Sequence, residues 1–102
     1  MSERTYTIYM QTPLGERGGI LFAERNGQKL NGWLDVLKHR EPFEGIVDED
    51  GNCRITGEFV TLMRRVAYIA TGQISDFSIH LEVKGERNIF ELSGVAYPES
   101  EE

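Results

Sequence analysis

The stretch from Phe43 to Phe59 limits what this chain can fold into more than any other part of it. It consists of two runs that alternate apolar and polar residues, joined at Asp50-Gly51. Asp-Gly between two such runs is a strong signal for a tight antiparallel hairpin. Each run carries a glycine at its middle, Gly45 and Gly57, on the side of its apolar residues. We therefore predict two antiparallel strands with a turn at Asp50-Gly51.

Comparable alternating runs occupy most of the remaining sequence, and Asn26-Gly27 is a second two-residue hairpin signal. Ile20 and Phe22 are expected on the inner face of their strand, and Pro42 is expected to delay the strand that follows it. The predicted strands are residues 4–12, 18–25 and 28–37, the two arms within 43–59, a strand through 68–74, and strands over 76–83 and 88–97. They add up to eight strands, nearly all joined by short turns.

The segment around residues 59–71 admits two interpretations. Its apolar residues also follow the three- and four-residue spacing of a helix, which Gly72 could end. No clear N-cap stands near Val60, and the residues from Tyr68 to Ile74 alternate as in a strand. We favour a strand, a turn over residues 62–65 and a second strand, with a helix at about 59–71 as the alternative.

Five glycines follow a polar residue in the middle of predicted strands, on their apolar faces: Gly32, Gly45, Gly57, Gly72 and Gly94. Glycine weakens a flat strand, so this recurrence indicates sharp coiling, which closing a small barrel requires. The predicted fold is all-β: a single antiparallel meander of about eight strands that closes into a small up-and-down β-barrel. A two-sheet β-sandwich is the alternative.

Length, net charge and cysteine content limit the number of domains, the classes of partner and the compartment expected for this protein. The 102 residues predict a single β-barrel domain over 1–102, with a frayed acidic tail at 98–102. The net charge of −6 argues against a nucleic-acid partner, which needs a basic face. We find no run of about 20 apolar residues that would span a membrane and no secretory signal. The single cysteine, Cys53, has no partner for an internal disulfide, so we expect a cytoplasmic protein.

The chain resembles, in architecture, the small up-and-down barrels of the calycin group, the lipocalins and avidins. The resemblance rests on strand number, hairpin turns and recurrent glycines across the whole chain. The lipocalin G-x-W opening is missing from the first strand, since Gly32-Trp33 are adjacent and stand in the third. The resemblance implies a ligand cavity and no particular ligand.

Motifs for metal, cofactor or nucleophilic chemistry are weak. The acids at 48 and 50 and Asn52 depart from a calcium loop, because the glycine precedes the third ligand position. His39 and His80 have no third zinc ligand, and Cys53 lies among apolar positions without a base. We therefore expect no metal, no cofactor and a buried, inert thiol.

Four side chains are candidates for ligand binding: Trp33, Arg64, Arg65 and Tyr68. The arginine pair could clamp a carboxylate or phosphate. If the face of Leu30 and Leu34 lines the interior, Trp33 is outside and favours an interface; in the opposite register it belongs to a ligand wall. Packing beneath a loop is the third reading of Trp33.

These features favour a non-enzymatic, calycin-like barrel that binds a small or apolar ligand in its interior. The inward residues expected to shape that interior are Tyr6, Phe22, Phe43, Phe59, Phe77 and Phe90. The alternative is a protein-interaction or homo-oligomerising module, such as a homodimer, with a fully packed core. It is suggested by a second apolar row: Trp33, Leu37, Ile46, Val60, Ile69, Ile89, Val95 and Tyr97. An enzyme comes third, with Arg64, Arg65, His39 and Asp35 as its first candidates.

Overall fold

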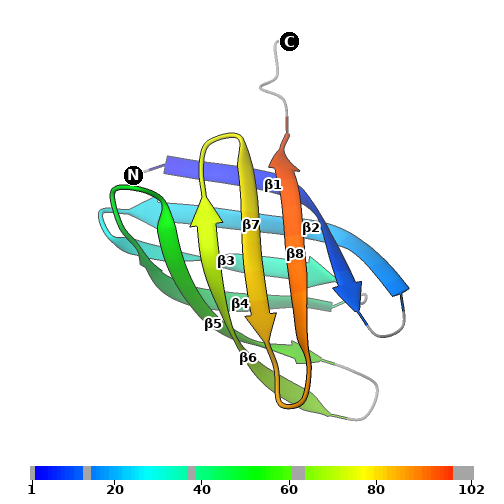
Figure 1. The fold of residues 1–102 in the computed structure, drawn as a ribbon. Coiled ribbons are helices and arrows are strands. Elements are labelled where there is room, and N and C mark those ends of the chain that lie inside the picture. Colours follow the sequence, from blue (N-terminus) through cyan, green and yellow to red (C-terminus); the bar gives the residue numbers. More distant parts are fainter. Residues whose placement is uncertain (1, 13–14, 37–38, 61–63, 98–102) are drawn as a thin grey trace.

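A computed structural model describes residues 2–12, 15–36, 39–60 and 64–97, and these form one closed antiparallel barrel (Figure 1). The strands are β1 (Ser2–Thr12), β2 (Gly15–Asn26), β3 (Lys29–Val36), β4 (His39–Val47), β5 (Asn52–Val60), β6 (Arg65–Ile74), β7 (Ser78–Lys84) and β8 (Ile89–Ala96). Each strand pairs with its successor in the sequence. The barrel closes where Tyr6–Met10 of β1 pair with Leu92–Ala96 of β8.

The predicted fold class is therefore confirmed, and both alternatives to it are wrong. The sheet is continuous around the barrel, so it does not split into a sandwich. Residues 59–60 and 65–71 belong to β5 and β6, so no helix forms there. Of the predicted turn, residues 62–63 lie outside the described residues, as does the acidic tail at 98–102. The described residues contain no helix at all, and hence none that could cross a membrane.

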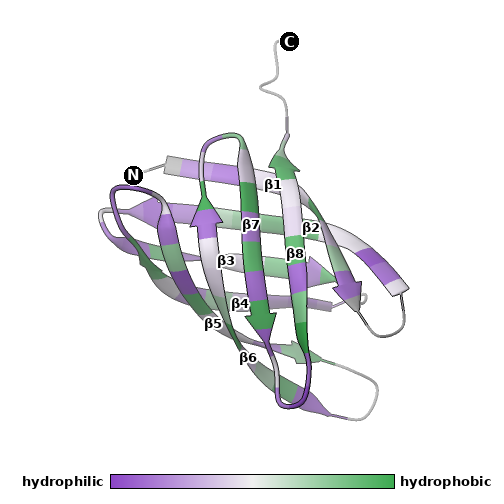
Figure 2. Ribbon diagram, in the orientation of Figure 1, coloured by the Kyte–Doolittle hydropathy of each residue, from purple (hydrophilic) through white to green (hydrophobic). Residues whose placement is uncertain are grey.

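Alternation along each strand places one set of apolar side chains inside the barrel. Figure 2 shows this as alternating green and purple along β7, where Ile79, Leu81 and Val83 are at most 2 % exposed. Leu92 and Tyr68 reach the same interior from β8 and β6. The enclosed space left among these side chains is only about 10 Å³, which is at the lower limit for a single water molecule. Side chains thus fill the barrel interior.

The inward glycines mark places where neighbouring strands come unusually close. A Cβ atom on Gly45 would lie 2.0 Å from the carbonyl oxygen of Arg54, and one on Gly72 would lie 2.0 Å from that of His80. Gly32 and Gly94 meet the same obstacle on their own neighbouring strands. This close approach supports the prediction that these glycines allow the sheet to coil into a small barrel.

Two of the predicted inward aromatics are misplaced. Phe22 lies on the outer face of β2, because its neighbours Leu21 and Ala23 fill the interior instead. Phe77 is 81 % exposed and precedes β7. The hydroxyl of Ser75 accepts hydrogen bonds from the backbone N–H groups of Phe77 and Ser78 and so forms a turn. β7 therefore begins at Ser78, two residues after the predicted start at residue 76.

Both predicted hairpin turns are shifted by about one residue. The N–H of Gly51 donates to the carbonyl of Asp48 at 3.1 Å, so the central residues are 49 and 50, and Gly51 follows with φ of 89°. In the β2–β3 hairpin, Asn26 pairs with Lys29, which makes Gly27-Gln28 the connecting pair. Pro42 also does not delay its strand, since β4 begins at His39.

Candidate binding site at the barrel mouth

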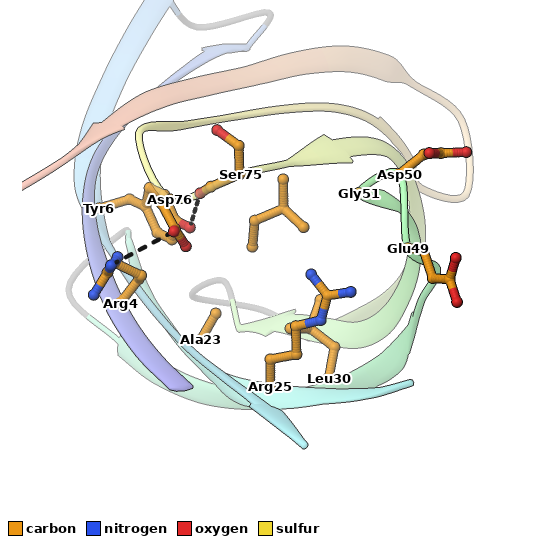
Figure 3. A pocket seen from close by; sticks show the side chains of 11 residues that line it. Arg4, Tyr6, Ala23, Arg25, Leu30, Glu49, Asp50, Gly51, Ser75 and Asp76 are labelled. Atoms are coloured by element: carbon orange, nitrogen blue, oxygen red, sulfur yellow. Dashed lines mark hydrogen bonds and ion pairs between the residues drawn. The ribbon is translucent and has the colours of Figure 1, made fainter. Parts of the chain in front are cut away.

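One end of the barrel is open and forms a cavity of about 260 Å³, which we call the mouth (Figure 3). Its floor is apolar and consists of inward side chains from four strands: Tyr6, Ala23, Leu30 and Ile74. Its rim is polar and consists of Arg4, Arg25, residues 49–51 of the β4–β5 turn, and Ser75 and Asp76 after β6. The mouth thus combines an apolar base with charged groups around it.

Tyr6 connects β1 to the turn after β6. Its hydroxyl donates a 2.5 Å hydrogen bond to the backbone carbonyl of Ser75. Burial, together with the nearby carboxylate of Asp76, raises the pKa of Tyr6 to about 12, so the hydroxyl stays protonated. Above it, Arg4 forms a 3.7 Å ion pair with Asp76 on the exposed rim, where such a pair adds little stability.

Arg25 extends the inward alternation of β2 by one step beyond Ala23, which brings its side chain to the rim of the mouth. Its Nη2 donates to the carbonyl of Asp48 at 2.8 Å, and its Nε donates to the carbonyl of Gly27 at 3.5 Å. Both acceptors are neutral backbone groups, and no carboxylate of the described residues forms an ion pair with Arg25.

The orientation of the charged side chains favours an anionic ligand group. Figure 3 shows the guanidinium of Arg25 directed over the opening, whereas the carboxylates of Glu49 and Asp50 point away from it. A guanidinium presents several N–H donors in one plane, which suits a carboxylate or phosphate. The mouth therefore offers an anion contact above an apolar floor.

The four predicted ligand-binding residues do not converge at the mouth. Arg65 and Tyr68 lie together in a groove on the outer wall, toward the other end of the barrel. Arg64 pairs with Glu86. Trp33 is on the outer face of β3, where its ring stacks on that of Phe22 with centroids 5.6 Å apart. The guanidinium carbon of Arg40 lies 3.8 Å from the centroid of the Trp33 ring.

The strand register shows on which side of the barrel wall Trp33 lies. Leu30 and Leu34 are buried inside, so Trp33 belongs to the outer surface, and its partial burial comes from Phe22 and Arg40. The outer apolar row is confirmed for Ile46, Ile69, Ile89, Val95 and Tyr97, which are all exposed; Val60 is half-buried, and Leu37 lies outside the described residues.

Within the described ranges, no three histidine, cysteine or acidic side chains come together in a way that could hold a metal ion. Cys53 is buried, as predicted, and burial raises the pKa of its thiol to about 11. His80 is on the outer surface, 4.0 Å from the carboxylate of Glu91. His39 and Asp35 also face outward or lie at a strand end, and Asp35 contacts Arg40 at 3.5 Å.

Sequence reasoning missed Arg4 and Arg25 for a specific reason. Both occupy positions where the inward alternation of a strand continues past its last apolar residue, two residues from Tyr6 and from Ala23. That signal was readable on β1. On β2 the expectation that Phe22 faces inward assigned Arg25 to the wrong side of the sheet.

No protein-family model matches the chain, and no curated protein or solved structure matches it either.

Proposed function

We propose that this protein is a non-enzymatic binding barrel that takes a small organic anion at its mouth. The observation that carries the proposal is the guanidinium of Arg25, which is held over an apolar-floored cavity of about 260 Å³ by two backbone carbonyls. The side chains that fill the interior leave no comparable space there. A reducing cytosol is the compartment that fits the single, buried Cys53.

The site favours a ligand with two parts. A carboxylate or phosphate would accept hydrogen bonds from Arg25, and a small apolar body would cover Ala23 and Leu30. The space is slightly below the range of drug-sized pockets, which start at about 300 Å³. A compact ligand such as an aromatic or branched aliphatic acid has the right size and chemistry.

Native mass spectrometry of gently purified protein comes first, because it weighs any bound passenger together with the chain. Calorimetric titration with benzoate then tests the anion contact, with benzyl alcohol as the neutral match. We expect benzoate to bind and Arg25→Gln to weaken it about tenfold or more, the value of a charged hydrogen bond. Arg87→Gln makes the same charge change at the far end of the barrel and should leave the affinity unchanged.

Ala23→Leu provides an independent test, since it fills the floor while keeping Arg25. It should exclude benzoate without loss of folding. Equal binding of benzoate and benzyl alcohol would contradict the anion contact, and unchanged binding in Ala23→Leu would contradict the mouth as the site.

A self-associating module is the second candidate, and one cluster of exposed apolar side chains favours it. Phe77, Val95 and Tyr97 are 81 %, 61 % and 48 % exposed. Val95 pairs with Ser78, and the N–H of Ala96 donates to the carbonyl of Phe77, so the three lie close together where β7 begins and β8 ends. Sedimentation of the wild type beside Phe77→Ser/Tyr97→Ser would show a dimer that the double variant loses; a wild-type monomer at high concentration would exclude it.

A further inference from the structure

The barrel wall has a gap between β4 and β5. Cross-strand pairing between them stops at Phe43 and Gly57. Beyond that point residues 39–42 still pair with β3 and residues 58–60 still pair with β6, but not with each other. The groove over this gap has a volume of about 620 Å³ and includes Pro42, Gly57, Ala67 and Ile69. We call it the seam groove.

Pro42 fits this gap because it has no N–H to donate. Its carbonyl oxygen lies 3.2 Å from the place where a Cβ on Gly57 would stand, so it faces β5. In an antiparallel strand the N–H and the C=O of one residue point to the same side. The nitrogen of Pro42 therefore also faces the gap, where no ladder hydrogen bond is required.

The hydroxyl of a largely buried tyrosine reaches the floor of the seam groove. Tyr68 is only 5 % exposed, and its ring stacks on Phe59 with centroids 4.5 Å apart. Its hydroxyl oxygen lies 2.7 Å from the position of a Cβ on Gly57, so it occupies the space left by the missing side chain. No group of the described residues forms a hydrogen bond with this hydroxyl. Since no fully buried side-chain oxygen or nitrogen of the described residues lacks a partner, this oxygen is accessible from the groove and can accept a hydrogen bond from a ligand there.

The charges around the seam groove favour a cation. Nη1 of Arg65 donates to Oε1 of Glu41 and to Oε1 of Glu58, both at 3.2 Å. Arg65 is thus committed to carboxylates on β4 and β5 and holds both over the gap. Glu44 also lines the groove, which leaves three carboxylates against one guanidinium.

We propose that the seam groove binds a primary ammonium group carried on a short apolar stem. The ammonium donates to the carboxylates of Glu41 and Glu58 and to the hydroxyl oxygen of Tyr68, while the stem packs against Pro42 and Ile69. The group can belong to a free alkylamine or to a lysine side chain of a partner. This site is separate from the mouth and does not depend on the anion proposed there.

Titration of ¹⁵N-labelled full-length protein with n-butylammonium tests the proposal, with n-butanol as the uncharged match. We expect saturable shifts at the amides of Gly57 and Ala67. Tyr68→Phe keeps the aromatic ring and should weaken binding about tenfold, as should Glu58→Gln. Glu86→Gln is the matched control, since Glu86 also pairs with an arginine and its side chain is 45 % exposed beside 49 % for Glu58.

Two further measurements show whether the ammonium group belongs to a free amine or to a partner's lysine, and whether binding is independent of the mouth. A lysine-containing tripeptide that binds more tightly than n-butylammonium identifies a partner side chain, and equal affinity identifies the free amine; either result supports the site. Ala23→Leu closes the mouth and should leave these shifts intact. Shifts that n-butanol reproduces, or that persist at full strength in both Tyr68→Phe and Glu58→Gln, would overturn the proposal.

Discussion

At the scale of single residues, glycines decide how closely the strands approach each other, because a Cβ atom would collide with the neighbouring strand. Gly45 shows this most clearly, because any Cβ there would meet the carbonyl oxygen of Arg54 at 2.0 Å. Gly45→Ala should therefore destabilise the protein by about 1–3 kcal/mol, the usual cost of forcing extra volume into a packed site. Urea unfolding measures this loss directly.

Gly85→Ala is the control for that substitution. A Cβ on Gly85 finds nothing nearer than 3.8 Å, so the alanine should be neutral or stabilise by about 0.4–1 kcal/mol through the unfolded chain. If both variants unfold at the same urea concentration, close approach is not what Gly45 provides.

Asp48 gives the β4–β5 turn a dependence on pH. The side-chain amide of Asn52, and then the backbone N–H groups of Asn52 and Asp50, donate to its carboxylate and hold its pKa below the usual 3.8. The resulting stability is present above pH 3.8 and is lost as the pH falls through the lowered value.

Asp48→Asn should therefore lower Tm at pH 7, because the amide keeps only one acceptor oxygen. The difference from wild type should shrink as the pH falls below 3.8. Melting curves from pH 7 to pH 2 provide the measurement, with Asp50→Asn as the control. A difference that stays constant across this range would contradict the role of the carboxylate.

At the scale of elements, alternation with a period of two was enough to predict all eight strands. Alternation did not predict which face points inward where both faces of a strand are apolar. On β2, Ile20 and Phe22 compete with Leu21 and Ala23, and only the packing against β1 and β3 decides which pair faces inward. The mouth could be predicted only with the correct choice, because Arg25 lies on the same face of β2 as Leu21 and Ala23. The seam groove depends on where pairing between β4 and β5 stops, which no local pattern encodes.

The end of the β5–β6 hairpin has few neighbours. Residues 58–60 lack partners on β4, and residues 65–68 lack partners on β7, whose pairing with β6 begins at Ile69. We expect amides that join these two segments to exchange with solvent faster than those joining Ile55 to Ala70, because they can open locally. Hydrogen exchange followed by NMR resolves the two groups. Equal protection in both would mean that the hairpin opens only with the whole barrel.

At the scale of the whole molecule, stability depends on one continuous interior. Leu81 is 2 % exposed inside it, while Ile89 is 62 % exposed on the outer face. Leu81→Ala should cost about 2–5 kcal/mol, whereas Ile89→Ala should stay within about 0.5 kcal/mol. Denaturant unfolding of both variants checks this contrast, and similar losses would show that the outer face is also packed against something.

Because β1 pairs with β8, the point at which the chain begins and ends can be moved without changing which strands pair. The N–H of Tyr97 donates to the carbonyl of Thr5, so the two ends of the described barrel lie side by side. A short flexible linker between them would produce a ring, and that ring could be cut at the exposed turn between β7 and β8 without removing a strand pairing. The barrel is therefore a natural candidate for circular permutation, with new termini placed far from the mouth.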